Sequence, residues 1–155
     1  MRVEELMTPN VFTVDPHDMV DRVFFLIHYE KVRHIPVVEK GKVVGIVSDR
    51  DMYKALGPKS NSNAIESNKE GTELHVVHKK VQNIMRRGVI SVTSDTLASE
   101  AAALMTSNRI SALPVIGGEK LVGILSSTDI LRVFSKIEHA KERREQRIAD
   151  RISHS

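Results

Sequence analysis

The chain repeats itself at a constant offset of 78 residues. Residues 3–52 align with residues 81–130 without a gap, and both copies end on the pattern Gly-x-x-Ser-x-x-Asp. Self-similarity at a fixed period indicates copies of one supersecondary unit that share a core. Because a unit of about 50 residues buries little apolar surface alone, we expect the two copies to pack face to face. This packing leaves symmetric clefts, toward which each copy directs one Ser and one Asp.

Composition limits the class of protein. At 155 residues, with 41% hydrophobic and 28% charged residues, the chain suits one globular domain or two fused half-domains. It contains no Cys, which excludes a disulfide framework, a thiolate metal site and a cysteine nucleophile. No apolar leader follows Met1, and no apolar run approaches the roughly 18 residues of a membrane span. We therefore expect a soluble, cytoplasmic protein that does not contact a membrane.

Each copy is expected to fold as strand, helix, strand, strand and helix. Residues 11–14 predict a short strand, and Asp15 and Pro16 are typical of a helix N-cap and first helical position. Residues 35–38 and 43–47 predict a hairpin, and the second copy repeats it at 113–116 and 121–125. A final helix opens at Ser48 in the first copy. Between the copies we expect an exposed, mobile connection over residues 57–72, and a short strand or packed linker at residues 74–77.

The motifs of the two copies resemble the CBS domain, the cystathionine β-synthase-type regulatory repeat, present as a tandem pair. The resemblance rests on His34-Ile35-Pro36-Val37-Val38 with Gly45-Ile46-Val47-Ser48-Asp49-Arg50-Asp51, on Ala112-Leu113-Pro114-Val115-Ile116 with Gly123-Ile124-Leu125-Ser126-Ser127-Thr128-Asp129, and on the openings at 6–9 and 84–87. It implies an α/β (α+β) fold of two pseudo-twofold-related repeats, each a small sheet flanked by helices. We expect repeat 1 over residues 2–56, a linker over 57–79, repeat 2 over 80–135 and a basic helical tail over 136–155. The resemblance also implies a flat homodimer paired through helices.

The resemblance implies that the clefts bind an adenosine-containing ligand, with AMP or ATP as first candidates, ADP, S-adenosylmethionine or NAD as others, and no metal. It assigns Asp51 and Asp129 to the ribose hydroxyls, and Ser48, Arg50 and Ser126 to the phosphate side. The chemistry agrees, because one carboxylate accepts from two hydroxyls and a helix N-terminus favours an anion. The candidate binding residues are Thr13, Val14, Arg33, His34, Ile35, Pro36, Ser48, Arg50, Asp51, Ser91, Val92, Ala112, Leu113, Pro114, Ser126, Thr128 and Asp129.

The two candidate clefts differ in charge. The first copy has Arg33, His34 and Arg50 where the second has Ser111, Ala112 and Thr128. The Asp51 cleft is therefore expected to favour more phosphate charge, and His34 to make binding pH-dependent near neutrality. The apolar walls are expected from Val14 or Val92 and from Ile35 or Leu113. An alternative is that each Ser and Asp only caps a helix, as in a capping box, and both readings can hold together.

All of the net charge of +3 lies in the C-terminal tail, where seven basic and four acidic residues follow from Arg132 onward. A helix is expected from Thr128 to about Ile152. Three alternatives remain open for its surface. It is a solvated helix with ion pairs such as Lys141 with Glu145, a basic stripe for nucleic acid or an acidic partner through Arg143, Arg147 and Arg151, or a helix that pairs across a dimer.

The sequence shows no catalytic constellation, and the pair His75 and His78 lacks a third ligand at matching spacing for a metal. We therefore expect no enzyme activity. The favoured function is an adenine-nucleotide sensor that regulates an unknown partner. The alternative is a protein–protein or nucleic-acid interaction module with empty or vestigial clefts, which uses the basic C-terminal helix.

Overall fold

The computed structural model describes residues 1–56, 66–67, 74–75 and 78–154. Most of the connection expected at residues 57–72 lies outside the described residues. The short strand β4 (Glu66–Ser67) of this connection pairs antiparallel with β5 (Leu74–His75), which follows it. The strand expected at 74–77 is therefore present over its first two residues, and residues 76–77 lie outside the described part.

The first repeat consists of α1 (Val20–Tyr29), β2 (His34–Glu39), β3 (Lys42–Ser48) and α2 (Asp49–Leu56). The two strands form the expected antiparallel hairpin, with a register shift between residues 37 and 38. Its two-residue turn places residues 40 and 41 at φ of 50° and 79°. Both angles lie in the left-handed region that a tight hairpin turn requires, and a glycine at the second position adopts it without strain.

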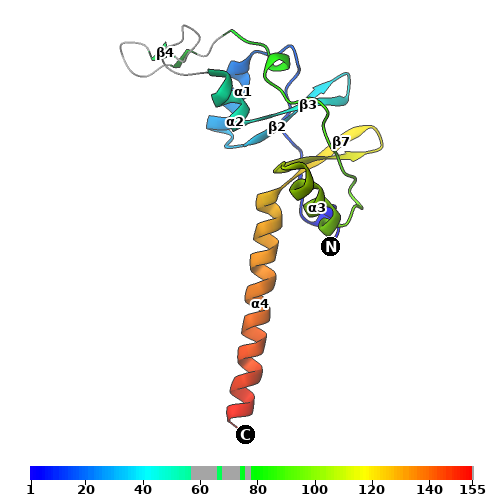
Figure 1. Cartoon of the computed structure of the whole chain (residues 1–155), viewed down its shortest axis with the longest axis vertical. Helices are drawn as coiled ribbons and strands as arrows, with labels where there is room; N and C mark the ends of the chain where they lie inside the picture. The colour runs from blue at the N-terminus through cyan, green and yellow to red at the C-terminus, as the bar shows by residue number, and fades with distance from the viewer. Residues whose placement is uncertain (57–65, 68–73, 76–77, 155) are drawn as a thin grey trace.

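The second repeat has the same order: α3 (Ala98–Asn108), β6 (Ala112–Gly117), β7 (Lys120–Ser126) and α4 (Ser127–Ser153). Its hairpin has the same register shift at the equivalent position, between residues 115 and 116. In Figure 1 the two repeats lie one above the other, with their hairpins side by side. The mixed α/β fold of two equivalent repeats is confirmed.

Two local expectations are wrong. Residues 11–14 form no strand, because only Val14 bridges to Val37 in the neighbouring hairpin. The first helix begins at Val20 after an N-cap at Met19, not at Pro16. The reason is that the side chain of Asp18 stabilises a turn that precedes the helix, because its carboxylate accepts a hydrogen bond from the Asp15 N–H at 2.8 Å. The acidic pair thus closes a turn before the helix.

The opening segments of the two copies are exchanged between the repeats. The short strand β1 (Thr8–Pro9) pairs with β7 of the second repeat, and residue 86 bridges to Ile46 of the first. Gly45 and Gly123 make this approach possible. A Cβ built at Gly45 would lie 2.5 Å from the Met85 sulfur, and one at Gly123 would lie 2.7 Å from the Met7 sulfur.

Each hydrophobic core therefore contains residues from both copies. Val81 lies fully buried in the first core, with Met85 packed beside it. Val3 lies fully buried in the second core, with Met7 packed beside it. The single-turn helices η1 (Val3–Glu5) and η2 (Val81–Asn83) carry these two valines. The expectation that the copies share a core is met by this reciprocal insertion.

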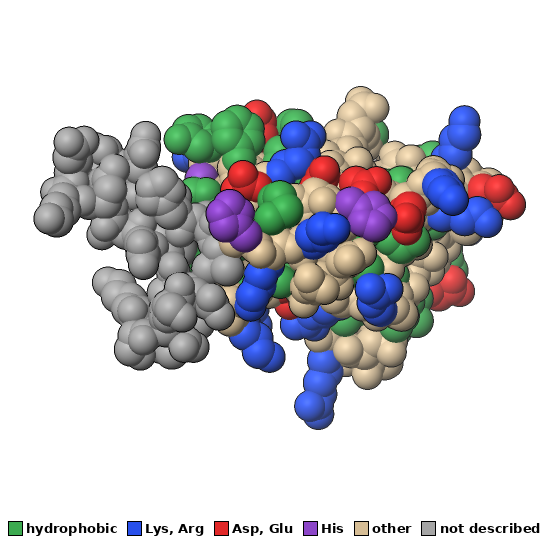
Figure 2. Space-filling model, turned by 90° about the horizontal axis from the view of Figure 1, so that it is seen from above, with side chains coloured by type: hydrophobic (Ala, Val, Ile, Leu, Met, Phe, Trp, Pro, Cys, Tyr) green, Lys and Arg blue, Asp and Glu red, His purple; other side chains and the backbone are tan. Residues whose placement is uncertain are grey.

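The last helix, α4, is 27 residues long and buries none of its residues. Figure 1 shows that it leaves the second repeat and extends away from both repeats for most of its length. Figure 2 shows the opposite end of the molecule, where acidic and basic side chains are interspersed with small hydrophobic areas. Among the residues that the structure describes, no helix combines the length and apolar character of a membrane span.

Candidate functional site

A cleft of about 690 Å³ lies between the two repeats. Its walls come from the starts of α2 and α4, from the ends of both hairpins, and from the segments at 10–12 and 86–90. The symmetric clefts expected from the sequence are therefore one continuous cleft in the described residues. This follows from the exchange, because the opening segment of each copy lies against the hairpin of the other.

The repeated Ser and Asp form a capping box at the start of each of the two helices. The Asp51 N–H donates to the Ser48 hydroxyl at 3.1 Å, and the Ser48 N–H donates to Asp51 Oδ2 at 2.9 Å. The second copy repeats both bonds between Ser126 and Asp129, at 3.2 and 2.8 Å. Because each box satisfies two backbone N–H groups, both aspartates are rotationally fixed while facing the cleft.

The second carboxylate oxygen of each aspartate, Oδ1, forms an ion pair with an arginine. Arg86 Nε lies 3.1 Å from Asp51 Oδ1, and Arg132 Nη1 lies 3.4 Å from Asp129 Oδ1. The aspartate side chains are only 10% and 12% exposed, whereas the arginines are 59% and 60% exposed. A ligand hydroxyl group that donates to Oδ1 would therefore share this oxygen with the arginine or displace the arginine from it. A displaced guanidinium would remain in the cleft.

The Asp51 half of the cleft depends on the second repeat for this arginine. Arg86 belongs to the segment that bridges to Ile46, next to the strand end that carries Ser48. In the second half, Arg132 lies on the same helix as its aspartate, three residues further along. The two halves are thus alike in chemistry but differ in which element supplies the cation.

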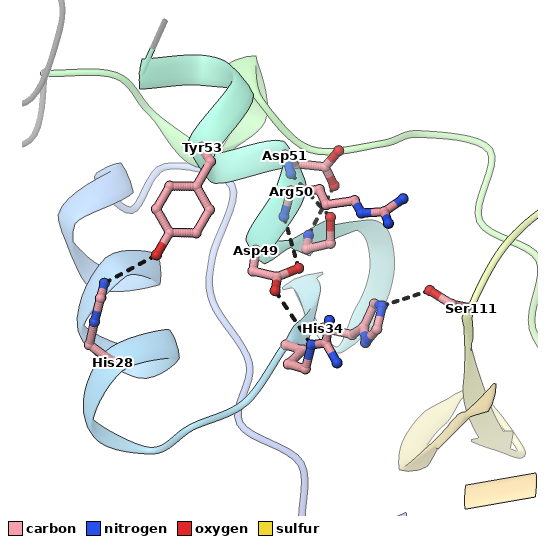
Figure 3. A network of polar contacts seen from close by, with 9 residues as sticks. His28, His34, Asp49, Arg50, Asp51, Tyr53 and Ser111 are labelled. Atoms are coloured by element: carbon pink, nitrogen blue, oxygen red, sulfur yellow. Dashed lines mark hydrogen bonds and ion pairs between the residues drawn. The ribbon is translucent and has the colours of Figure 1, made fainter. Parts of the chain in front are cut away.

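A polar contact joins the repeats across the cleft. His34 Nε2 and the Ser111 hydroxyl lie 2.9 Å apart, and Figure 3 shows the two side chains pointing toward each other. Burial is the main cause that lowers the pKa of His34 below its ordinary value of 6.5. The Asp49 carboxylate and, less strongly, Asp51 oppose this lowering of the pKa, whereas the Arg33 guanidinium and, less strongly, Arg86 add to it. A neutral imidazole is therefore favoured in the folded chain near pH 7.

The lining of the cleft is strongly cationic. Seven basic side chains line it against three acidic ones, which leaves four net positive charges before His34 is counted. The basic side chains are Lys31, Arg33, Arg50, Arg86, Arg87, Arg109 and Arg132, and the acidic ones are Asp49, Asp51 and Asp129. Arg109 and Arg132 belong to the second copy, so that half also contains cations. Field lines from such a lining concentrate anions in the cleft.

The structure brings nine of the seventeen predicted binding residues together on the cleft wall: Arg33, His34, Ser48, Arg50, Asp51, Ala112, Ser126, Thr128 and Asp129. The other eight do not line it: Thr13, Val14, Ile35, Pro36, Ser91, Val92, Leu113 and Pro114. Ile35 and Leu113, which were expected to wall a ring, are fully buried in the two cores. Apolar lining comes instead from Val11, Phe12, Val32, Ile90 and Ile110.

The sequence-based prediction missed the arginines at 86, 87, 109 and 132 and the exposed ring of Phe12. Arg86 and Arg87 align with Thr8 and Pro9 of the first copy, so the repeat comparison alone gives them no role. Their place in the sequence could have predicted a role in the cleft, because they belong to the opening segment of the second copy. That prediction would have required knowing that each opening segment lies against the hairpin of the other repeat.

The arrangement is suited to binding an anion that also carries hydroxyl groups. Two helix N-termini, two carboxylates and several exposed guanidinium groups face one space, and a polyhydroxylated phosphate ester can engage all three kinds of group. The 45%-exposed Phe12 and the neighbouring aliphatic side chains offer an apolar surface for a planar ring.

A family model for the CBS domain matches the chain twice, over residues 3–58 and 81–136. Among solved structures, the chain is similar to the CBS domain pair of protein MJ0100 in complex with 5′-methylthioadenosine and S-adenosyl-L-methionine. The TM-score is 0.71 at 25% identity, over 88% of this chain and 97% of that one. It is also similar to CBSX2 in complex with AMP, with a TM-score of 0.68 at 27% identity, over 88% of this chain and 98% of that one.

A third similar structure is the cytosolic domain of the Mg²⁺ channel MgtE in complex with ATP. Its TM-score is 0.64 at 26% identity, over 85% of this chain and 48% of that one. Four curated relatives from Methanocaldococcus jannaschii and Methanosarcina acetivorans are 27–31% identical to the chain. The chain spans only 22–47% of their length.

Proposed function

Because the chain belongs to the CBS domain family as a tandem pair of repeats, we propose that it is a regulatory module that binds an adenine nucleotide in the cleft between them. The observation that carries the proposal is that both Ser–Asp capping boxes line one cationic cleft. Similar solved structures are complexes with AMP, with ATP, or with 5′-methylthioadenosine and S-adenosyl-L-methionine. The module binds its ligand without converting it, and the output is exerted on another protein.

In this proposal the ribose hydroxyl groups donate to Oδ1 of Asp51 or Asp129. Arg86 or Arg132 then leaves that oxygen and contacts the phosphates, where its planar fork makes two parallel hydrogen bonds. Ser48 and Ser126 keep their bonds to the helix backbone, and the positive ends of the two helix dipoles lie beside the phosphate. The ligand thereby exchanges an internal ion pair for a phosphate contact, which limits the electrostatic cost of binding.

The charge of the lining favours AMP or ATP over S-adenosylmethionine. Four net positive charges in the cleft attract a polyanion, whereas S-adenosylmethionine carries a sulfonium cation that they repel. Between the two nucleotides, the greater number of guanidinium groups than a single phosphate can occupy favours ATP. A ligand that touches both repeats stabilises one relative arrangement over others, and it regulates only through that difference in affinity.

Thermal unfolding tests the proposal directly. We would measure the unfolding temperature with AMP, ADP, ATP, S-adenosylmethionine and NAD at about 1 mM, for the natural chain and for Asp51→Asn and Asp129→Asn. A ligand with a dissociation constant of about 10 μM stabilises the folded state by about 2.7 kcal/mol. For a domain of this size that is a shift of roughly 5–11 °C.

The Asn amide oxygen can still accept the N–H of the N-cap serine three residues earlier, so both variants should fold. A shift with a nucleotide that disappears in one variant would support the proposal and assign the half-site. The matched control is Asp21→Asn on the exposed side of α1, which should leave the shift unchanged. No shift with any nucleotide would contradict the proposal and favour an interaction module. Salt-dependent binding to duplex DNA that is lost on truncation after Ser135 would then test the nucleic-acid form of that alternative.

A further inference from the structure

The helices α1 and α3 both end at a basic residue whose backbone is left-handed. Lys31 directly follows the C-cap residue of α1 and has a φ of 55°, and Arg109, the C-cap residue of α3, has a φ of 54°. The two positions are equivalent, because they differ by the 78-residue offset of the repeat. A left-handed residue is common where a helix ends, but it is usually Gly or Asn, because a Cβ in this conformation crowds the following carbonyl oxygen. A long basic side chain is therefore unusual at both positions.

The helix ends themselves do not require these side chains. Two other non-glycine residues in the described part of the chain have a positive φ, and each has a local explanation. Lys40 lies in the hairpin turn, which requires this conformation, and Asn10 is a residue type that adopts it readily. A cation does gain from the dipole at a helix C-terminus, but positions in the last turn offer that gain without a left-handed backbone. Backbone strain of this kind occurs preferentially at functional sites.

Both side chains line the cleft and lack a carboxylate partner. Each of the three acidic side chains of the cleft forms an ion pair with one arginine, at 3.4, 3.1 and 3.4 Å. The four remaining cations of the lining have no ion pair among the described residues: Lys31, Arg50, Arg87 and Arg109. Of these four, only Lys31 and Arg109 occupy equivalent positions of the two repeats. The strained positions therefore supply an unpaired, exposed cation from each repeat.

The two cations lie beside the contact that joins the repeats. Lys31 is three residues before His34, and Arg109 is two residues before Ser111. The side chains of His34 and Ser111 meet at 2.9 Å across the cleft, as Figure 3 shows. Because three residues span at most about 10 Å, both cations are held close to this junction. An anion bound there can contact one cation from each repeat.

A phosphate chain suits this pair of cations. In the proposed binding mode, a helix N-terminus and Arg86 or Arg132 already serve the first phosphate of the ligand. Lys31 and Arg109 remain available for phosphates beyond the first, and ammonium and guanidinium groups both form charge-assisted hydrogen bonds with phosphate oxygens. A monophosphate offers no group for them to bind.

We propose that Lys31 and Arg109 bind the distal phosphates of a polyphosphate ligand at the junction of the repeats, and that they determine a preference for a nucleoside triphosphate over a monophosphate. The adenosine part of this ligand rests on the proposed function, whereas the polyphosphate part does not. Each helix keeps a strained basic residue because its charge serves the cleft. Stability and binding are therefore opposed at these two positions.

Asparagine substitution separates the two effects, because Asn adopts the left-handed conformation readily but carries no charge. Without ligand, Lys31→Asn, Arg109→Asn and the double variant should each unfold at the temperature of the natural chain or above it. Titration calorimetry of the full chain should show ATP affinity lower by about 10- to 100-fold in the double variant, and AMP affinity changed much less. Binding of inorganic tripolyphosphate should be lost. The charge-retaining variants Lys31→Arg and Arg109→Lys should keep most of the ATP affinity.

Lys40→Asn is the matched control. It relieves the same backbone conformation and removes the same charge in a hairpin turn outside the cleft, so it should raise stability and leave ATP affinity unchanged. Unchanged ATP affinity in the double variant would overturn the inference while leaving the nucleotide proposal intact. Tripolyphosphate binding that depends on Lys31 and Arg109, in a chain that binds ATP no better, would support the inference and contradict the nucleotide proposal. A natural chain that binds neither ATP nor tripolyphosphate would overturn both.

Discussion

At the scale of single residues, the two cleft aspartates have divided roles. Oδ2 of each belongs to its own helix, through the N–H group of the serine three residues earlier, and Oδ1 belongs to an arginine. The capping and binding interpretations of these residues are therefore compatible, because they use different oxygens. In the proposed binding mode the arginine changes partner, which makes it the more informative position to substitute.

Arg86→Gln should separate phosphate recognition from ribose recognition. The change removes a charge-assisted contact of about 1.5–3 kcal/mol, so ATP affinity should fall by about 10- to 100-fold and adenosine affinity much less. Titration calorimetry with ATP, AMP and adenosine measures this difference. Arg22→Gln on α1, whose arginine pairs with Asp18 away from the cleft, is the matched control. Equal losses for ATP and adenosine would place Arg86 outside the phosphate site.

His34→Gln should remove a pH dependence of stability. The unfolded imidazole titrates near about pH 6.5, and the folded pKa is lowered by burial. Between those two values the unfolded chain binds more protons, so stability rises with pH. The contribution of His34 is fully present above about pH 6.5 and is lost as pH falls toward the folded pKa. Denaturant unfolding between pH 5 and pH 8 measures this slope.

Glutamine keeps a hydrogen-bonding group near Ser111 but cannot titrate. The variant should therefore lose the part of the slope that lies below about pH 6.5. His139→Gln, on the exposed surface of α4, is the comparison variant and should keep the natural profile. Identical profiles for the natural chain and His34→Gln would show that this imidazole does not couple folding to pH.

At the scale of elements, local chemistry explains which parts the sequence could predict. The hairpins follow from β-branched runs around glycine turns, and the starts of α2 and α4 follow from Ser and Asp three residues apart. The predicted start of α1 was wrong because Asp15 and Asp18 have the spacing of a capping box but stabilise a turn before the helix. Arg86 was missed because it reaches its aspartate through a long-range exchange. Sequence periodicity carries no information about such pairing.

The capping boxes themselves should contribute measurable stability. Ser48→Ala and Ser126→Ala each remove the hydroxyl that accepts a helix N–H, which costs about 1 kcal/mol. The unfolding temperature should fall by about 2–4 °C for each. Ser135→Ala, at an exposed position within α4, should leave it unchanged or raise it slightly, because Ala is the better helix former. A smaller effect at 48 and 126 than at 135 would contradict the capping role.

At the scale of the whole molecule, the exchange makes the two repeats one folding unit. The Val3 N–H donates to the Thr96 carbonyl at 2.9 Å, and the Val81 N–H donates to the Asp18 carbonyl at 2.8 Å. Each opening segment thus completes the backbone hydrogen bonding as well as the core of the other repeat. One cleft with two Ser–Asp boxes is the consequence, since the exchange holds the two hairpins against each other.

Separated repeats should therefore fail to fold alone. A fragment of residues 80–155 lacks Val3 and Met7, and a fragment of residues 1–56 lacks Val81 and Met85, so each has an incomplete core. Circular dichroism should show no cooperative unfolding for either fragment, whereas co-expressed fragments should form a complex that unfolds cooperatively. Val3→Ala in the full chain is the milder test and should cost about 2 kcal/mol. Although Val3 belongs to the first copy in sequence, amide exchange should accelerate first in β6 and β7, because its side chain lies in their core. Cooperative unfolding of residues 80–155 alone, at the temperature of the full chain, would show that the exchanged segment is dispensable.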